Sequence, residues 1–448
     1  MASNTITETD VVAGRRPPGP SGLPVVGNLH RYLRGPLAFV ESCAREYGDV
    51  VYTNVAGETY MVAHPDHVER VLVTDDHRFR KAELGQGRLE PIFGNGLVVS
   101  DGEYWRRQRT RMQPAFRPDR IAAYAEVMRR QAAATAERWV PGQTIQVDEE
   151  MRRLTLGILV QSLFGTDLGG REAEIREAFE LVMGRFEGVN TWLPGWLPTP
   201  ANRRFERGRE RLDAIVYDLI DERRESAADR DDLLSTLLVA EDERGERMTD
   251  EAVRDEVVTL LAAGHDTTAL ALTYAWHLLG THPDATDRLH AELEEVLDGA
   301  TPTLADLSAL EYTEAVVSEA LRLYPPTHAT AREATEDVAF GEYVVPGGST
   351  IFLPQWILHR DGRWWDDPET FRPGRWLEER DRPEYAYFPF GGGPRHCIGH
   401  RFATVEARLV LATIASCWRL EPASSDLSIR PVITLRPTDP VEMVVHKR

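Results

Sequence analysis

A cysteine motif near the end of the chain constrains its fold and chemistry more than any other feature. The ten residues from Phe390 to Gly399 read FGGGPRHCIG, with Phe, Gly, Arg, Cys and Gly at relative positions 0, 3, 5, 7 and 9. At average residue usage, such a match arises by chance roughly once per million start positions. Its glycines let the backbone turn sharply and approach a flat molecule closely. The apolar-rich segment from Ile398 to Trp418 predicts a helix whose N-terminus stabilises a thiolate at Cys397.

This motif resembles the axial-ligand loop of the cytochrome P-450 family. The resemblance implies that the cofactor is haem b (iron protoporphyrin IX), that Cys397 ligates its iron, and that Phe390, Arg395 and Gly399 contact it. A thiolate ligand donates electron density to iron and favours cleavage of the O–O bond. The alternative interpretation is a free, buried cysteine in a glycine-rich turn, which is the usual state of a lone cysteine.

Length and composition fit one large domain. The chain has 448 residues, of which 42% are hydrophobic, and we expect a single domain at residues 15–448 after a disordered tail at residues 1–14. The resemblance implies a fold that is mainly α with small β-sheets and has a long central helix over the haem. The sequence contains no run of 18 apolar residues, so no membrane-spanning helix is predicted. The polar N-terminus lacks the layout of a signal peptide. A soluble, cytoplasmic protein is therefore expected.

Charge and cysteine content argue against other classes of protein. With 72 acidic and 52 basic residues the net charge is −20, so nucleic-acid binding is not expected. Whether this acidity reflects a halophilic source or a GC-rich genome stays open. Three cysteines are too few for a disulfide scaffold at this length, which fits a reducing compartment. Cys43 and Cys417 lie in helix-like stretches, where we expect inert core thiols.

Hydrophobic and turn patterns predict a helix-rich body with small sheets. Residues 105–300 are mostly helical in pattern, apart from a loop rich in Trp, Pro and Gly at Asn190–Pro200. The other predicted elements are a helix at Leu37–Tyr47, a hairpin of strands Val50–Val55 and Thr59–Ala63, strands within 338–354, and paired strands at Leu427–His446.

A helix about 30 residues long is predicted to cross the middle of the protein. Thr249 is a good capping residue, and the apolar pattern continues to about Gly280. Within it, residues 263–268 read AGHDTT, which places small, acidic and hydroxyl residues among leucines. Such local conflicts tend to mark functional sites. The alternative is a simple helix kink with a solvated acid, since a threonine can hydrogen-bond the carbonyl one turn back.

The oxygen-binding motif of the family has the same form as AGHDTT. By that resemblance, Thr267 hydrogen-bonds dioxygen, and Asp266 supplies protons toward it through water. Ala263 and Gly264 then lie beside the haem, and Gly264, having no Cβ, lets the flat ring approach the helix backbone.

Glu319 and Arg322 are three residues apart and share one face of a predicted helix. An isolated pair of this kind is usually a weak surface ion pair. In the family, however, this Glu-x-x-Arg motif is a buried structural pair that a second arginine completes, and Arg375 matches that position. Gly374 replaces the usual acid and Trp376 a common Phe, which are mild departures. The resemblance implies that these three charged residues hold the cysteine loop.

Haem carries two propionates, so its pocket needs cations. Trp105 and Arg109 match the Trp-x-x-x-Arg helix of the family and share one helical face, and the resemblance gives both a propionate contact. Arg395 and Arg332 match two further propionate partners. His359 is a weaker candidate, because a structural histidine in a turn is at least as good an interpretation.

Residues 105–120 form a basic run, with six arginines and one acid. Most charge runs are solvated faces, but in so acidic a chain we predict a docking surface for an acidic electron donor, with Arg111 and Arg117 contributing. The chain has neither a glycine-rich dinucleotide fingerprint nor iron–sulfur cysteine spacing. Electrons must therefore come from a separate ferredoxin-like or flavin protein.

The resemblance runs from about residue 17 to the end and implies a monooxygenase. One atom of O₂ enters a C–H bond or double bond of a lipophilic small molecule, such as a fatty acid, terpenoid, steroid or polyketide, and the other atom becomes water. By resemblance the substrate pocket is formed by four segments, Phe79–Gly96, Met183–Trp196, Pro326–Thr330 and the central helix near Ala263, with apolar side chains such as Leu84, Leu89, Ile92 and Phe93.

Two alternatives stay open. The first is a haem-thiolate enzyme driven by peroxide, although such enzymes tend to lack the acid–alcohol pair seen here as Asp266 and Thr267. The second is a non-catalytic haem sensor or carrier, which would not need proton delivery.

Overall fold

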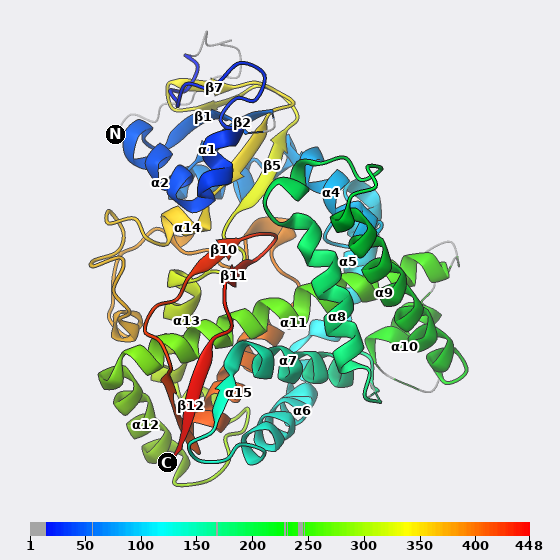
Figure 1. The fold of residues 1–448 in the computed structure, drawn as a ribbon, viewed down its shortest axis with the longest axis vertical. Helices are drawn as coiled ribbons and strands as arrows, with labels where there is room; N and C mark the ends of the chain where they lie inside the picture. The colour runs from blue at the N-terminus through cyan, green and yellow to red at the C-terminus, as the bar shows by residue number, and fades with distance from the viewer. Residues whose placement is uncertain are drawn as a thin grey trace, which may run out of the picture.

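The structure is a computed structural model that describes residues 15–55, 57–166, 169–227, 230, 232–240, 245 and 247–448. The tail expected at residues 1–14 lies outside the described residues. Helices make up most of the body, and a five-stranded sheet lies at the end that holds α1 and α2 (Figure 1). The mainly α fold with small β-sheets that the sequence predicted is therefore confirmed.

The central helix of the prediction is α11 (Asp250–Thr281), which crosses the middle of the body (Figure 1). It begins where expected, because the side chain of Thr249 accepts a hydrogen bond from the backbone N–H of Ala252 at 3.2 Å. The helix α7 (Val147–Leu163) packs along it, and Thr155 of α7 donates a hydrogen bond to the carbonyl of His265 at 2.9 Å. Most of α11 is buried, so this helix is a fixed support for any site beside it.

Other helices surround this pair. They are α4 (Glu83–Phe93), α5 (Gly102–Met112), α6 (Pro118–Glu137), α8 (Glu172–Met183), α9 (Pro200–Arg224), α10 (Leu233–Val239), α12 (Pro283–Leu297), α13 (Glu311–Leu323) and α15 (His400–Ala415). Three short helices lie nearer the main sheet, namely α1 (Leu29–Arg34), α2 (Pro36–Tyr47) and α3 (Pro65–Glu69), and α14 (Gln355–Leu358) follows the last strand of that sheet. The predicted loop at Asn190–Pro200 overlaps the 3₁₀ turn η5 (Gly188–Trp192), which follows η4 (Gly184–Phe186).

The five-stranded sheet has the strand order β1-β2-β8-β5-β3. Its strands are β1 (Val50–Asn54), β2 (Glu58–Val62), β8 (Thr350–Leu353), β5 (Thr330–Ala334) and β3 (Phe79–Lys81). Strands β1 and β2 form the predicted antiparallel hairpin, and β2 then pairs in parallel with β8. Strands β5 and β3 lie at the end of this sheet that is nearest the helices. Residues near 81 and 332 therefore reach the centre of the protein.

Smaller sheets complete the fold. The paired strands expected at Leu427–His446 are β10 (Ile429–Pro431) with β11 (Leu435–Pro437), followed by β12 (Glu442–Lys447). The last strand lies between β4 (Thr144–Gln146) and β9 (Trp418–Pro422), and β6 (Val338–Phe340) pairs with β7 (Tyr343–Val345).

Two further sequence expectations concern cysteines and membranes. Cys43 lies in α2 and is buried, and burial raises the pKa of its thiol to about 11, so it fits the predicted core thiol. Cys417 is exposed, and the prediction of a second core thiol was wrong because α15 ends at Ala415, two residues before it. Across the described part of the chain, no helix combines the length and apolar character needed to cross a bilayer.

Candidate active site

A cavity of about 360 Å³ lies between α11 and the loop that carries Cys397, and we call it the Cys397 cavity. One wall is α11 near residues 259–271, and the opposite wall is the segment 389–399 with the first turns of α15. All nine residues that the sequence assigned to cofactor binding line this cavity, namely Trp105, Arg109, Ala263, Gly264, Arg332, Phe390, Arg395, Cys397 and Gly399. Residues from four separate parts of the chain therefore converge as expected.

Cys397 occupies the turn before α15, where protein surrounds its side chain and the accessible surface of that side chain faces the cavity. Its backbone N–H donates to the carbonyl of Phe390 at 3.0 Å, which closes the loop. Burial raises the pKa of the Cys397 thiol, while the backbone N–H of Gly399 and the charge of Arg109 act in the opposite direction. A bound metal ion would deprotonate a thiol that coordinates it outright.

Glycines shape this loop at two positions. Gly391 and Gly393 have φ angles of +72° and +63°, which only glycine adopts readily. A Cβ on Gly393 would also lie 1.8 Å from the carbonyl oxygen of Leu72. The sharp turn predicted from the glycine run is therefore present.

Gly264 lines the cavity and also lies where α11 meets α7. A Cβ there would lie 2.3 Å from Cδ1 of Leu159 on α7, so the absence of a side chain allows the two helices to pack closely. The predicted approach of a ring to this backbone stays a prediction.

Thr267 faces the Cys397 cavity from α11. Its hydroxyl donates a hydrogen bond to the carbonyl of Ala263 at 2.7 Å, one turn back along the helix. That bond leaves the oxygen of Thr267 free to accept a hydrogen bond from a molecule in the cavity. The neighbouring Thr268 also lines the cavity and donates to the carbonyl of Gly264 at 3.2 Å. Two hydroxyl groups therefore line the apolar wall opposite Cys397.

Asp266 points away from the cavity into a buried group of polar residues. Arg436 pairs with its carboxylate at 2.8 Å, the hydroxyl of Thr434 donates to it at 3.0 Å, and Arg152 lies 3.8 Å from it. Although burial opposes ionisation, the charges of Arg436, His265 and Arg152 lower the pKa of Asp266, so it is an anion at neutral pH. The alternative of a solvated acid is wrong, because this side chain is buried.

Four cations surround one side of the Cys397 cavity, namely Lys81, Arg109, Arg332 and Arg395. Burial lowers the pKa of Arg332 to about 10, with repulsion from Arg395 adding to the effect. Burial and the charges of Arg395 and Arg332 also lower the pKa of Lys81 to about 7. The nearby carboxylate of Asp101 forms an ion pair with Arg395. Cations that are buried and repel one another indicate a site that binds an anionic group.

These features fit haem, the cofactor that the resemblance implies. The thiol of Cys397 lies on one side of the cavity, apolar and hydroxyl side chains cover the other, and the buried cations could pair with two carboxylates. Arg109 also donates to the carbonyl of His396 at 2.9 Å, so one side chain bridges α5 and the cysteine loop. The guanidinium of Arg395 lies over the ring of Trp105, 4.4 Å from its centroid.

Glu319, Arg322 and Arg375 form the predicted buried cluster. Glu319 accepts hydrogen bonds from Arg322 at 2.8 Å and from Arg375 at 3.0 Å, and all three side chains are fully buried. Trp376, which departs from the family pattern, donates to the other carboxylate oxygen of Glu319 at 2.8 Å. The weak surface pair that a lone Glu-x-x-Arg would suggest is excluded.

This cluster connects to the cysteine loop through His359 and Tyr387. Arg322 donates to the carbonyl of His359 at 2.8 Å, and the ring of His359 accepts the backbone N–H of Phe388 at 3.0 Å. Burial lowers the pKa of His359 well below its usual value, so its ring is neutral and can accept that bond. Tyr387 packs on Trp376 with ring centroids 4.7 Å apart. His359 is thus a structural residue outside the cavity, which agrees with the alternative interpretation of a structural histidine in a turn.

The predicted substrate segments divide between two cavities. Pro326, Thr327 and Thr330 line the Cys397 cavity, whereas parts of Phe79–Gly96 and Met183–Trp196 line a second cavity. Ile92 and Phe93 are buried in the core, Leu89 lines the second cavity, and the side chain of Leu84 lies outside the described residues. Sequence resemblance placed the segments near the site but could not say which cavity each one faces.

Several residues of the site were not anticipated from the sequence. Lys81 is one of the four cations that line the Cys397 cavity, and Asp101 forms an ion pair with another of them, Arg395. Around Asp266 the unanticipated residues are Arg436, Arg152 and Thr434. One signal was available, since Lys81 is one of only two lysines in the chain and lies in a predicted pocket segment. The partners of Asp266 lie more than 100 residues away in the chain, and no local pattern marks them.

Comparison with known proteins adds an independent result. The family model described as Cytochrome P450 matches residues 17–443. The chain is 40% identical over 442 residues to cyclooctatin synthase of Streptomyces melanosporofaciens, covering 96% of this chain and 95% of that protein. It is 39% identical to cyclooctat-9-en-7-ol 5-monooxygenase of the same organism, over 96% of this chain and 95% of that protein. It is 38% identical to pentalenene oxygenase of Streptomyces avermitilis, over 92% and 93% of the two chains.

Proposed function

This chain belongs to the cytochrome P450 family, and from that premise we propose that it hydroxylates a cyclic terpenoid. It is a haem-dependent monooxygenase that acts on a lipophilic organic substrate with electrons from a redox partner. The observation that supports the narrower substrate class is the near-full-length similarity to enzymes named for a cyclooctatenol and for pentalenene, both of which are terpenoids. The apolar surface of the Cys397 cavity suits such a substrate.

We propose haem b as the cofactor, with Cys397 as its iron ligand. The three cysteines are all described, and Cys397 alone among them lines the cavity, so no second thiol is available to attach the porphyrin covalently. Arg109, Arg332, Arg395 and Lys81 would hold the propionates as charge-assisted partners. When bound, the haem supplies the oxygen-activating chemistry, and the protein supplies binding, orientation and protons.

We assign proton supply to Thr267 and Asp266. Thr267 presents its oxygen to the cavity, where it accepts a proton from water and passes one on. Asp266 lies one residue away, and its carboxylate is ion-paired with Arg152 and Arg436. Because an arginine does not release its proton at neutral pH, these ion pairs hold the anion in place, and water would carry protons between solvent, Asp266 and Thr267. The alternative interpretation, in which residues 263–268 only kink the helix, would not require an ionised side chain at Asp266.

Product analysis tests the substrate class. We expect the enzyme, supplied with a reductase and a bacterial ferredoxin, to add one ¹⁸O atom from ¹⁸O₂ to a cyclic sesquiterpene or diterpene. Under the same conditions, a linear alkane of equal carbon number should give roughly tenfold less product, because a rigid ring loses less conformational entropy on binding. Equal turnover of both hydrocarbons would contradict a preference for cyclic terpenoids.

The same assay separates proton supply from substrate binding. Thr267→Ala should lower product per O₂ consumed by at least about tenfold, because general acid groups contribute factors of this size or more. Thr267→Ser keeps the hydroxyl and should recover most of the yield. If Thr267→Ala gave full yield, Thr267 would have no part in proton delivery, although the substrate class could still hold.

We propose that the electron donor is ferredoxin-like or a flavin protein and that it docks on the basic run. Arg106, Arg107 and Arg117 of this run are exposed, whereas Arg109 reaches the cysteine loop from the same segment. This surface therefore gives a short path from an external donor to Cys397, and its charge suits an acidic partner.

Charge reversal tests this docking surface. Arg117→Glu should slow reduction by an acidic ferredoxin about tenfold at low ionic strength, and the difference should shrink as salt is added. Arg45→Glu, an exposed arginine on α2, is the control and should leave the rate unchanged. Stopped-flow absorbance measures both. An unchanged rate for Arg117→Glu would remove this surface from the docking site.

We also propose that the enzyme works in the cytoplasm. All three cysteines are free thiols, and free thiols persist in reducing compartments.

A further inference from the structure

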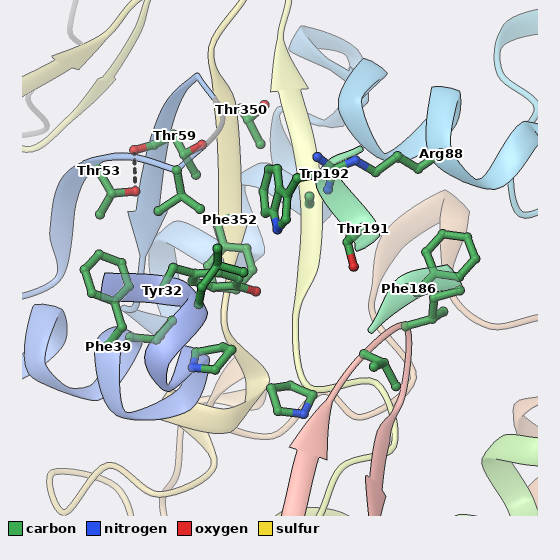
Figure 2. A pocket seen from close by; sticks show the side chains of 18 of the residues that line it. Tyr32, Phe39, Thr53, Thr59, Arg88, Phe186, Thr191, Trp192, Thr350 and Phe352 are labelled. Carbon is green, nitrogen blue, oxygen red and sulfur yellow. Dashed lines mark hydrogen bonds between the residues drawn. The ribbon is translucent and has the colours of Figure 1, made fainter. Parts of the chain in front are cut away.

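A third cavity, of about 600 Å³, lies at the end of the body that holds α6, α12 and α15 (Figure 1), and we call it the Cys417 cavity. The last turns of these three helices, the loop at residues 299–302 and the adjoining ends of β9 and β12 line it. It shares no lining residue with the Cys397 cavity or with the cavity beside Trp192 that Figure 2 shows. Its volume is within the range of roughly 300–1,000 Å³ that small-molecule sites have.

Cys417 lines this cavity as an exposed thiol at the far end of α15 from Cys397. The helix between the two cysteines has 16 residues and is therefore roughly 24 Å long. On the neighbouring strand, the backbone N–H of Arg448 donates to the carbonyl of Cys417 at 3.0 Å, and Lys447 lies opposite Trp418. Pairing of β9 with β12 thus places two basic residues beside the thiol.

Thr413 supplies a polar group inside the Cys417 cavity. It lines the cavity from α15, four residues before Cys417, and is only 3% exposed. Within the part of the chain that the structure describes, its hydroxyl has no hydrogen-bond partner. The large majority of buried polar side chains in native proteins have such a partner, and a bound molecule is one explanation of an exception. The hydroxyl of Thr413 therefore indicates that this cavity accepts a polar ligand.

Charges of both signs line the cavity. Arg448 pairs with Glu294 at 3.3 Å, so this cation already has an anionic partner. Lys447, Glu137 and Asp298 line the cavity as well, and none of them forms an ion pair with another described residue. A ligand that carries both carboxylate and ammonium groups would supply partners for these three side chains.

We propose that Cys417 is a site of thiol–disulfide exchange and that the Cys417 cavity binds the reacting partner, a low-molecular-weight peptide disulfide. A carboxylate of the peptide pairs with Lys447, and its ammonium group pairs with Glu137 or Asp298. The hydroxyl of Thr413 hydrogen-bonds to a peptide group. This inference goes beyond the proposed function and does not depend on it, because the reaction needs neither haem nor substrate.

The exchange balances without another reagent. Cys417 gives up its proton, and its sulfur attacks one sulfur of the peptide disulfide. A new S–S bond to Cys417 forms as the S–S bond of the peptide breaks, and the departing thiolate takes up the proton. The number of disulfide bonds is unchanged, so no oxidant or reductant besides the peptide disulfide is consumed.

Incubation of the holoenzyme with glutathione disulfide tests the proposal. Intact mass gives the rate of modification, and peptide mapping should locate one glutathionyl group on Cys417. The comparison compound is bis(2-hydroxyethyl) disulfide, which has no charged groups. Each rate is divided by the rate of the same disulfide with N-acetylcysteinamide, because leaving-group acidity alters the rate of exchange.

After this division, glutathione disulfide should react with Cys417 at least about fivefold faster than the uncharged disulfide, as expected from one favourable charge contact. A bare exposed thiol should show the opposite preference, because the chain has a net charge of −20 and glutathione disulfide is an anion. A ratio of one or less would therefore overturn the proposal, as would an adduct on Cys43 or Cys397 in place of Cys417.

Variants separate recognition from exposure of the thiol. Lys447→Gln should slow the reaction with glutathione disulfide about fivefold and leave that with the uncharged disulfide unchanged. Thr413→Val should slow it about threefold without lowering the melting temperature, because the hydroxyl makes no hydrogen bond within the protein. Arg138→Gln is the matched control, since Arg138 is exposed at the end of α6 but does not line the cavity, and both rates should stay unchanged. Equal rates for Lys447→Gln and the unmodified enzyme would show that no peptide site surrounds Cys417.

Discussion

Replacing Cys397 by histidine should abolish the red-shifted Soret band of the reduced, carbon-monoxide-bound enzyme and give a band at the imidazole-ligated position. Cys397 is the one of the three cysteines that lines the Cys397 cavity, and a thiolate ligand gives iron the electron density that favours O–O cleavage. Substrate hydroxylation should then fall by at least about 100-fold, which corresponds to roughly 2.7 kcal/mol of activation free energy. Difference spectroscopy and product analysis measure the two effects.

Cys417→Ser provides the matched control for this change. That thiol is exposed and lies two residues beyond the end of α15, so its loss should alter neither spectrum nor product. A Cys397→His variant that kept the red-shifted band would show that another group ligates the iron. In that case the assignment of every residue around the Cys397 cavity would have to be revised.

Features that depend on local sequence were predicted well. The cap at Thr249, the start of α11, and the β1–β2 hairpin follow from neighbouring residues, and each was confirmed. The cysteine motif also predicted which distant residues share its cavity, because the order and spacing of family motifs carry that information. Trp376 is an instructive departure, since its indole N–H binds Glu319 and so adds a polar contact that a phenylalanine could not make.

Features that depend on tertiary packing were not predicted. Asp266 was placed on the correct helix, but its partner Arg436 comes from β11, and only the folded chain brings them together. The close approach of Leu159 of α7 to Gly264 was not predicted either, because the two residues lie on different helices. The lining of a cavity also depends on which face of a strand a residue occupies, and a one-residue difference on β5 moves a side chain from one cavity to the other.

The second large effect concerns Glu319, and we expect Glu319→Gln to destabilise the enzyme by about 3–5 kcal/mol. The carboxylate neutralises Arg322 and Arg375, whose side chains are fully buried, and glutamine would leave both charges without an anionic partner. Since domains are stable by only about 5–15 kcal/mol, much of the protein should unfold or lose haem at 37 °C. Denaturant titration and haem content of the purified variant measure the loss.

Glu314→Gln on the same helix is the control, because Glu314 pairs with Arg408 at 2.9 Å but its side chain is 53% exposed. Removing that exposed ion pair should cost less than about 1 kcal/mol.

Acid provides a second test of the buried cluster. Burial alone would raise the pKa of Glu319, but the hydrogen bonds and charges of Arg322 and Arg375 lower it below its usual value.

This direction fixes the pH dependence of the cluster. A carboxyl group with a lowered folded-state pKa contributes its full stabilisation above its unfolded-state pKa of about 4.3 and loses it as the pH falls through the folded value. The stability difference between the unmodified enzyme and Glu319→Gln should therefore be constant near neutrality and narrow below about pH 4.3. A difference under 1 kcal/mol at pH 7 would show that solvent or rearrangement neutralises the two arginines. The cluster would then not be what holds the cysteine loop, and the bond from the Phe388 N–H to His359 would be the next candidate.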